Sequence, residues 1–542
     1  MPIKKSLAAL AGTVAVLVAL AGCAGSGDSP KSSDSATPVS GGTYKHAFSF
    51  PGVITSLDPP TLIFHEALQV VRALTDSLVD QDPKTGEIVP WIATKWEVSP
   101  DAKTYTFTLR DGATFSDGTP IDAAAVKANF DRIQALGPKA VGAAPLLIGF
   151  TGTTVVDKKT VKFEFSQPSA LFLQALSGAV FGLISPKDLT KDPAAIAKGD
   201  YAGSGPFTLK SYNPQSEIDL DKRVGYDTPS SLAKHTGDAY VDHLVFIEEG
   251  TPSKRADQVL SGEIQSAAQI AYQDESRLKA GGATLLPLKI PGLTENLIIN
   301  QKSFLGSEPK VRQALLAAID TATITKTVFG PSYGPGTSSL GSNTPGYADE
   351  SSLISYNPKK AKALLDEAGW VPGADGIREK DGKKLTIRVP GIGAWGASNG
   401  DAAVLLQAQL KEVGIDLPLD KSDSATQQAA LASGDYDADK WQMTRADPSV
   451  LNAVWNSKHT SQGYAWAQPG PLDDLLAAQE SEVDPKARAA ASAKVQEYLI
   501  KNAWSIPLDD RAWTYAYNST AHGLRADAET KLVFYDVWVD SK

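Results

Sequence analysis

The sequence predicts an α/β protein in which mixed β-sheets are covered by helices, and three observations lead to this fold class. From Gly42 onward, segments with the two-residue alternation of a strand and segments with helical spacing follow one another, without a detectable internal repeat. Hairpin patterns lie among the helical ones, so a purely parallel sheet is not expected. The 542 residues, 42% hydrophobic and 21% charged, correspond to a soluble globular chain of about three or four domain-sized units.

The balance of charged residues argues against nucleic acid as a partner. The net charge is −10, from 52 basic and 62 acidic residues, and the sequence has no long basic run. Neutralising phosphates requires a concentrated patch of lysine and arginine. We therefore expect no nucleic-acid partner.

The residues that usually bind metals are few and scattered. Cys23 is the single cysteine, so neither an intramolecular disulfide nor a four-cysteine zinc site can form. The six histidines lack His-x-x-x-His and His-Glu-x-x-His spacing, and Met443 is the only methionine after the first residue. We expect neither a metal site nor a cofactor.

The N-terminus has the pattern of a lipoprotein signal. Residues 1–22 start with two lysines near the terminus, continue with an apolar run too short for a membrane span, and end in Leu-Ala-Gly before Cys23. This ending resembles a bacterial lipobox, which implies cleavage before Cys23 and attachment of diacylglycerol to its thiol. The alternative is an ordinary signal peptide followed by a chance cysteine.

The next segment predicts a flexible tether. Residues 23–41 are dominated by Gly, Ser, Asp, Pro and Thr, with almost nothing to bury. Two acyl chains on Cys23 would suffice for stable membrane attachment. The apolar run 169–184 is interrupted by polar residues and Gly178, so it predicts a core helix rather than a second span.

Strand and helix signals then define the elements of the folded part. The alternation starting at Thr104 reaches two Asp-Gly turns and predicts an antiparallel hairpin, and 153–165 predicts a second one. Helical spacing over 121–134 follows Asp122, a suitable N-cap. Further helices are expected at 256–264, 310–319, 358–368, 402–413 and 485–501, and further strands from 207 to about 246, at 297–300 and within 513–539.

The stretch from Ile92 to Ile133 and several later motifs resemble those of a known protein family. The stretch from Ile92 to Ile133 resembles the signature region of the extracytoplasmic solute-binding proteins of peptide and nickel ABC importers. Matching motifs follow in family order over nearly the whole chain after the signal, and their number makes the resemblance specific. They include GSGPF at Gly203, VDHLVFIEEGTPSKRADQVLSGEI at 241–264, KVRQALLAAID at 310–320, PKKAKALLDEAGW at 358–370, GDYD at 434–437 and Asp447-Pro448.

The resemblance implies a two-lobed, periplasmic-binding-protein-like fold with hinge strands and an extra domain inserted in the first lobe. By this analogy lobe I consists of 42–80, 203–295 and 511–542. The inserted domain is 81–202, and lobe II is 296–510. Sheet strands at both ends of the chain agree with a chain that crosses between lobes.

The resemblance also implies a function. We expect a binding protein rather than an enzyme: a monomer, lipid-anchored on the extracytoplasmic face of the cell membrane, that delivers a solute to an ABC permease and its ATPase subunits. An oligopeptide is the leading ligand class; a non-peptide anionic conjugate of the opine or sugar-acid type and an oligosaccharide are alternatives. A secreted hydrolase is a distant alternative.

The segment after the Gly-Asp-Tyr-Asp motif should supply the lobe II contacts of the ligand. There Arg445 stands where the family carries a small residue or an acid, and guanidinium binds carboxylates and phosphates through paired hydrogen bonds. Arg445 is therefore a candidate ligand contact. The alternative is an ion pair that only shapes the loop, with Asp437, Asp439 or Asp447.

Four neighbouring or matching positions complete the lobe II candidates. Trp441 and Trp395 offer flat walls for a ligand, with core packing as the alternative for each, and Trp395 lies in a glycine-rich turn after a strand. Met443 falls near the family's usual aromatic residue. Asp447 belongs to the Asp-Pro element, so a role in binding an amine stays open.

His46 is the lobe I candidate. It lies on the early strand that should border the cleft. A hydrogen-bonded structural histidine is the alternative.

Overall fold

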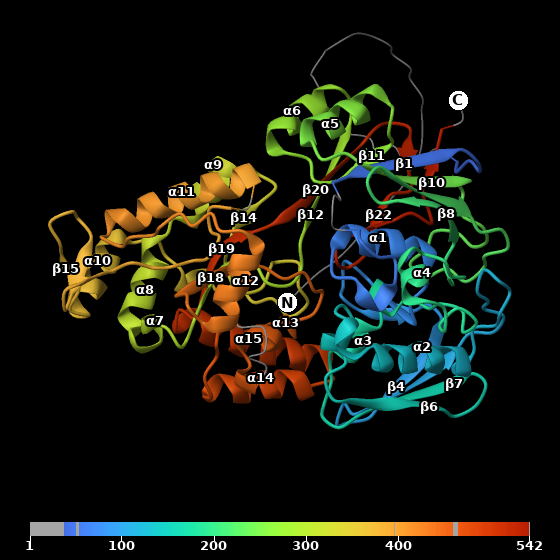
Figure 1. Cartoon of the computed structure of the whole chain (residues 1–542), viewed down its shortest axis with the longest axis horizontal. Helices are drawn as coiled ribbons and strands as arrows, with labels where there is room; N and C mark the ends of the chain where they lie inside the picture. The colour runs from blue at the N-terminus through green and yellow to red at the C-terminus, as the bar shows by residue number, and fades with distance from the viewer. Residues whose placement is uncertain (1–36, 50–53, 395, 459–463, 541–542) are drawn as a thin grey trace, which may run out of the picture. The chain divides into compact units, whose positions relative to one another are not determined.

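The computed structural model describes residues 37–49, 54–394, 396–458 and 464–540 (Figure 1). Its mixed sheets and covering helices confirm the predicted α/β class. We keep the terms lobe I, inserted domain and lobe II for the ranges given above, as a proposed division. None of the helices in the described residues is both long and apolar enough to cross a membrane.

The seven-stranded sheet of lobe I is mixed. Its β1 is parallel to both neighbours, whereas the other pairs are antiparallel. In sheet order the strands are β12 (Thr284–Lys289), β20 (Ala512–Tyr517), β11 (Ser266–Ala267), β1 (Thr43–Phe48), β10 (His243–Glu248), β9 (Glu217–Lys222) and β8 (Phe207–Asn213). Two hydrophobic clusters flank this sheet, with helices α1 (His65–Leu74), α5 (Pro252–Ser261) and α6 (Tyr272–Ala280).

The sheet of lobe II is packed on both faces, because successive residues of a strand point to opposite sides. Leu297 and Ile299 of its strand β13 belong to one hydrophobic cluster, and Ile298 between them belongs to another. The strand order is β14 (Gly334–Pro335), β19 (Ser505–Asp510), β13 (Glu295–Ile299) and β18 (Ala438–Trp441). The first cluster includes α8 (Pro309–Ala318), α9 (Thr321–Val328), α10 (Pro358–Glu367) and α11 (Gly396–Glu412); the second includes α13 (Val450–Trp455), α14 (Pro471–Ser481) and α15 (Pro485–Lys501).

The inserted domain has a four-stranded antiparallel sheet, β4 (Ala93–Val98), β5 (Thr104–Leu109), β7 (Thr160–Phe165) and β6 (Phe150–Val155), in that order. Helix α2 (Ala123–Leu136) packs on β6 and β7 (Figure 1). Asp122 accepts a hydrogen bond from Ala125 N at 3.0 Å, which confirms the predicted N-cap. Phe130 of this helix packs edge to face on Phe163 of β7, with 4.7 Å between the ring centroids. The sheet and the helix therefore share one core.

The predicted hairpin starting at Thr104 is wrong, whereas the hairpin over 153–165 is confirmed as β6–β7. Strand β5 pairs with β4 on one side and with β7 on the other, so the residues after it find no free edge. Those residues form only an isolated bridge between Thr114 and Pro120.

The predicted core helix at 169–184 is also wrong. The segment forms only α3 (Phe172–Ala175) and a 3-10 turn at Ala179–Phe181. A Cβ on Gly182 would lie 2.0 Å from Thr75 Oγ1, so the chain approaches Thr75 more closely than a regular helix with side chains would allow.

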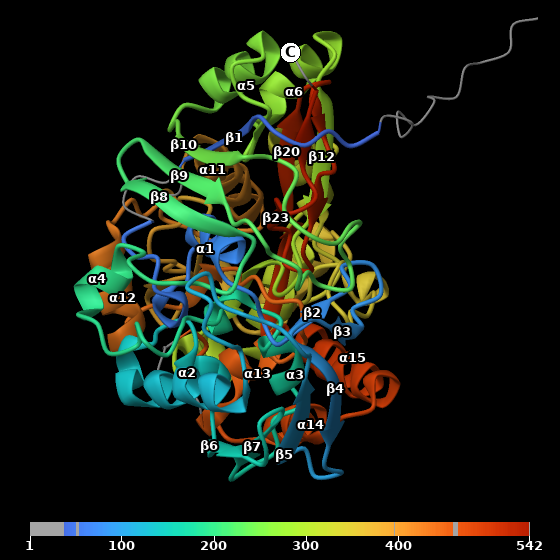
Figure 2. The ribbon, with the colours of Figure 1, turned by 90° about the vertical axis from the view of Figure 1, so that its right-hand side faces the viewer.

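The chain crosses between the two large sheets twice, from β12 to β13 and from β19 to β20. Figure 2 shows β12 and β20 side by side, in agreement with their pairing. Beyond this pairing, Ile290 N donates to Arg511 O at 3.0 Å and Lys289 Nζ donates to Asp510 O at 2.8 Å. The two crossings are therefore held together, and we call them the hinge.

The remaining elements are short or peripheral. They are α4 (Pro193–Ala197), α7 (Phe304–Ser307) and α12 (Ser424–Ser433); the strand pairs β2 (Val79–Gln81) with β3 (Ile88–Pro90), β21 (Ala521–His522) with β24 (Trp538–Val539), and β22 (Arg525–Ala526) with β23 (Leu532–Val533); and the sheet β15 (Val371–Pro372), β16 (Arg378–Lys380) and β17 (Lys383–Lys384).

Candidate functional site

The segment after β18 continues its pairing along the hinge. Met443 O accepts a hydrogen bond from Leu293 N at 2.9 Å, and Arg445 N donates to Pro291 O at 3.1 Å. Between them, Gly292 has φ +109°, and a Cβ there would lie 2.0 Å from Met443 O. Only glycine permits this approach. The backbone of Arg445 is therefore fixed beside the hinge.

The side chain of Arg445 lines a pocket between lobe II and the inserted domain. We call it the Arg445 pocket; its lining residues are Pro145, Leu146, Ile148, Gln167, Pro168, Ser169, Leu171, Arg445, Ser449, Asn452, Ala453 and Glu480. The guanidinium makes one long hydrogen bond, from Nη1 to Ser449 Oγ at 3.4 Å. Among the residues that the structure describes, no carboxylate oxygen lies within 4.0 Å of it.

The aspartates that could have paired with Arg445 have other surroundings. Asp437 accepts from Arg388 Nε at 3.0 Å. Asp439 Oδ2 is buried and finds no partner in the described part of the chain, and burial raises the pKa of this carboxyl to about 7. The alternative of an ion pair between Arg445 and one of these aspartates is therefore not what the structure contains.

Asp447 forms an ion pair with an arginine of helix α15. Arg488 on α15 binds both of its carboxylate oxygens, at 2.5 and 2.8 Å. Asp447 Oδ1 also accepts from Ser449 N at 2.8 Å, in the turn that precedes α13. These bonds give Asp447 a role in shaping the turn.

Glu480 is the residue of the pocket that sequence reasoning missed. It lies near the end of α14, and its Oε2 is buried without a hydrogen-bond partner in the described residues. Burial raises the pKa of Glu480 to about 7, although Arg488 acts in the opposite direction. Its backbone oxygen accepts from Ala170 N of the inserted domain at 3.1 Å, so Glu480 lies where the two parts meet.

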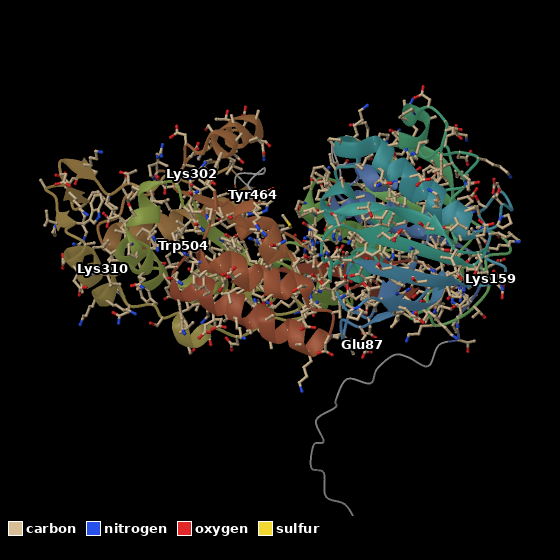
Figure 3. The ribbon with its side chains drawn as sticks, turned by 90° about the horizontal axis from the view of Figure 1, so that it is seen from below. Glu87, Lys159, Lys302, Lys310, Tyr464 and Trp504 are labelled. Carbon is tan, nitrogen blue, oxygen red and sulfur yellow. The ribbon has the colours of Figure 1, made fainter. Side chains whose placement is uncertain are left out.

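Trp441 and Met443 point away from the Arg445 pocket, into the second cluster of lobe II. The Trp441 ring stacks on Tyr464, labelled in Figure 3, at 5.3 Å between centroids. Trp441 Nε1 is nevertheless buried without a partner among the described residues. The contacts of the Trp441 ring match the packing alternative for this residue, apart from its ring nitrogen, and Met443 packs against the same cluster.

His46 lies in the core of lobe I and does not line the Arg445 pocket. It is fully buried, and its Nδ1 lies 2.8 Å from Ser266 Oγ. Burial lowers the pKa of His46 to about 3, so the ring stays neutral. Its aromatic neighbours are Phe48, Phe246, Tyr515 and Phe534. These contacts match the structural alternative. Trp395 and Cys23 lie outside the described residues.

A second group of charges lies at the hinge, and we call it the hinge cluster (Glu295, Lys440, Asp509, Arg511). Arg511 forms an ion pair with Glu295 and another with Asp509, the latter at 3.2 Å. Lys440 Nζ lies 3.4 Å from Glu295 Oε1. Burial acts to raise the pKa of Glu295, but Arg511 and Lys440 outweigh it and lower this pKa.

Residues 391–396 read Gly-x-Gly-x-x-Gly, the spacing of a dinucleotide-binding turn, and residues 396–400 read Gly-x-Ser-x-Gly, the spacing of a nucleophile elbow. Neither motif was identified from the sequence alone. Each motif indicates its chemistry only where a strand is followed by a tight turn and a helix. Here the last strand before the turns at 391–394 is β17, which ends at Lys384, so the strand expected directly before this glycine-rich turn is not found in the described residues, and Ser398 already lies inside α11. The context for either chemistry is therefore missing in this described region. In the described chain no group of three or more His, Cys, Asp or Glu residues is arranged to hold a metal ion.

Comparison with known proteins adds to this geometry. The model of the bacterial extracellular solute-binding proteins, family 5 middle, matches residues 87–465. The glutathione-binding protein GsiB of Salmonella typhi is 28% identical over 504 residues, covering 89% of this chain and 92% of that protein.

Solved structures agree on the fold. NikA from Brucella suis in complex with Fe(III)-EDTA superposes with a TM-score of 0.78 at 25% identity, covering 92% of this chain and 100% of that one. AgaA from A. tumefaciens R10 in complex with agropinic acid superposes with a TM-score of 0.73 at 24% identity, covering 92% and 99%. The two-lobed periplasmic-binding-protein fold expected from the sequence is thus confirmed.

The family match covers well over half of the chain, and the fold agrees over nearly all of it. Members of this group are extracytoplasmic binding proteins of ABC importers and not enzymes. The chain therefore belongs to family 5 of the bacterial extracellular solute-binding proteins.

Proposed function

We propose that this protein captures a carboxylate-bearing solute, with an oligopeptide as the leading class, and delivers it to an ABC permease. The observation that carries the proposal is the Arg445 guanidinium, which lines the pocket between lobe II and the inserted domain without a carboxylate partner. A half-buried arginine that has no counter-ion in the described chain offers two parallel donors to an incoming carboxylate.

The relatives support a carboxylate as the shared chemistry. Glutathione, EDTA and agropinic acid, which the compared proteins bind or hold, all carry carboxylates. The peptide class is favoured by glutathione, which is itself a tripeptide. The second candidate, an opine-type acid, is favoured by the agropinic acid complex. No observation favours a neutral oligosaccharide.

Lobe closure would couple capture to delivery. A solute bound between the lobes stabilises the closed form in proportion to its extra contacts there. The paired crossings of the hinge give the lobes a defined axis. The closed protein, as a monomer, would dock on the permease, whose ATPase subunits drive transport.

The test is a calorimetric titration of the protein, freed of co-purified solute by unfolding and refolding. The probes are glutathione, trialanine, agropinic acid and maltotriose. We expect at least one of the three acids to bind and maltotriose not to bind. Arg445→Ala should weaken acid binding by about 10-fold to 100-fold, the range for a charged hydrogen-bonded contact. Arg277→Ala, on the exposed face of α6, is the matched control and should bind as the wild type does. Equal binding by Arg445→Ala and the control would reject the proposal.

We also propose that Cys23 carries the lipid anchor, on the sequence pattern around it. In cells fed labelled palmitate, the wild-type protein should be labelled and found with the membrane fraction. Cys23→Ser should be unlabelled and keep its signal segment. An unchanged label on Cys23→Ser would contradict the anchor.

A further inference from the structure

Helix α6 of lobe I contacts a segment of lobe II beside the hinge. The Tyr272 ring lies so close to Gly330 that a Cβ at Gly330 would overlap it. Gly330 also has φ +72°, a conformation that favours glycine. Two residues later, Ser332 Oγ donates a hydrogen bond to Glu275 Oε1 at 3.1 Å. We call these four residues (Tyr272, Glu275, Gly330, Ser332) the α6 contact.

The first turn of α6 supplies both side chains on the lobe I side. Glu275 is 5% exposed, and the helix dipole favours an acidic side chain at this end of a helix. In the described part of the chain no cation lies within 4.0 Å of its carboxylate. A buried carboxylate needs hydrogen-bond donors, and the Ser332 hydroxyl is one that comes from the other lobe.

The lobe II side of the α6 contact leads directly into the hinge. Phe329 and Tyr333, on either side of the contact residues, stack with 4.7 Å between ring centroids. Gly334 of β14 then pairs with Asp510, at the end of β19 where the chain crosses back to lobe I. Because the α6 contact joins the two lobes beside this crossing, a rotation of one lobe against the other must strain or break it.

The same arrangement of the lobes assembles the Arg445 pocket. The walls of the pocket come from lobe II and the inserted domain. These two parts meet where Gln81 Nε2 donates to Ala446 O at 3.0 Å and Ala170 N donates to Glu480 O at 3.1 Å. None of the four residues of the α6 contact lines the pocket. Two separate sets of contacts thus stabilise one arrangement.

We infer that the α6 contact sets the affinity for the solute from outside the Arg445 pocket, by stabilising the arrangement of the lobes in which that pocket is assembled. The affinity part of this inference rests on the proposed function, whereas the effect on the lobes does not. When only a fraction of the molecules is competent to bind, the apparent affinity falls in proportion to that fraction. Loss of the α6 contact lowers the fraction and therefore weakens binding.

The first measurement is affinity. Tyr272→Ala and Ser332→Ala each remove one half of the α6 contact, and the probes are glutathione, trialanine and agropinic acid. By calorimetry on the full chain we expect each variant to bind about twofold to tenfold more weakly than the wild type, the range for the loss of one such contact. Tyr356→Ala is the matched control, because this lobe II tyrosine is 44% exposed and Tyr272 is 43% exposed. Arg277→Ala, whose ion-pair partners lie within lobe I, is the control on α6 itself. Both controls should bind as the wild type does.

The second measurement needs no solute. Cys23→Ser leaves a chain without cysteine, so two spin labels can be placed on Val224→Cys of lobe I and Val371→Cys of lobe II. Both positions are exposed, at 82% and 59%. We expect Tyr272→Ala to increase the fraction of molecules outside the main label-to-label distance of the wild type, and Tyr356→Ala to leave that fraction unchanged.

The outcomes separate this inference from the proposed function. Unchanged label distances in Tyr272→Ala, or unchanged or tighter acid binding in Tyr272→Ala and Ser332→Ala, overturn the inference and leave acid binding in place. If the wild-type protein binds none of the three acids, the proposed function fails. The label distances then still decide whether the α6 contact holds the lobes.

Discussion

Two charged regions of the molecule are built from the same residue types and differ in one respect. In the hinge cluster, Arg511 and Lys440 surround Glu295, and every ion pair lies within one sheet and its crossing strand. In the Arg445 pocket, the arginine and the glutamate come from separate loop and helical segments and make no ion pair with any residue that the structure describes. The first arrangement stabilises the fold, and the second is available to a ligand. We therefore propose that the paired charges of the hinge cluster serve the fold and that Arg445, which forms no ion pair with the described residues, serves binding.

The largest expected effect tests the structural half of this comparison. Arg511→Ala leaves Glu295, whose side chain is 4% exposed, without its closest cation. Breaking a buried ion pair on one side costs about 3–5 kcal/mol. We expect urea unfolding to show a loss of that size, with Arg277→Ala, an exposed pair, as the control losing about 0–1 kcal/mol. Equal losses in the two variants would show that the hinge cluster is not a structural unit.

The second effect is a difference in pH dependence between the two glutamates. Burial raises the pKa of Glu480 to about 7, above the value of about 4.3 in an unfolded chain. The folded protein therefore holds this proton more tightly, and the associated stability is lost as pH rises from about 4.3 through about 7. Glu480→Gln removes this loss. Measured by urea unfolding, it should gain on the wild type between pH 5 and pH 8, by up to about 3 kcal/mol.

Glu295 has the opposite sign. Arg511 and Lys440 outweigh burial and lower its pKa, so its ionised form stabilises the fold above about 4.3, and this stability is lost as pH falls. Glu295→Gln should be less stable than the wild type at pH 7 and approach it as pH falls below about 4. The same sign of pH response in both variants would remove the distinction between the two regions.

The sequence predicts well those elements whose causes are local. Asp122 caps α2 because a short acidic side chain precedes a helical pattern, and the β6–β7 hairpin follows from a turn between two alternating runs. The hairpin at Thr104 failed because β5 takes its partners from β4 and β7, and pairing across a sheet is decided by the whole domain. Its local pattern was that of a strand, and it is a strand.

The site was predicted in part for a similar reason. Arg445 was identified by residue type and position, but two of the aspartates considered as its partners, Asp437 and Asp447, form ion pairs with Arg388 and Arg488 from other elements. Glu480 has no sequence signal, since a glutamate near a helix end is ordinary. Its raised pKa arises only when the fold buries it near Asp447, and Arg488 acts in the opposite direction. Three-dimensional packing, rather than composition, separates it from the other acidic residues.

The smallest expected effect is the most direct test of the ligand half of the comparison. Arg445→Met keeps most of the volume and removes a charge that has no counter-ion in the described structure, so it removes no ion pair and no short hydrogen bond. Replacing a poorly compensated charge with an apolar group of similar size is often neutral or stabilising. We therefore expect the free energy of unfolding to change by less than about 0.5 kcal/mol, or to increase, the range of substitutions that disturb no packing feature. The same variant should lose acid binding in calorimetry. A loss of stability comparable to that of Arg511→Ala would mean that Arg445 holds the loop in place, and that its apparent freedom does not mark a binding residue.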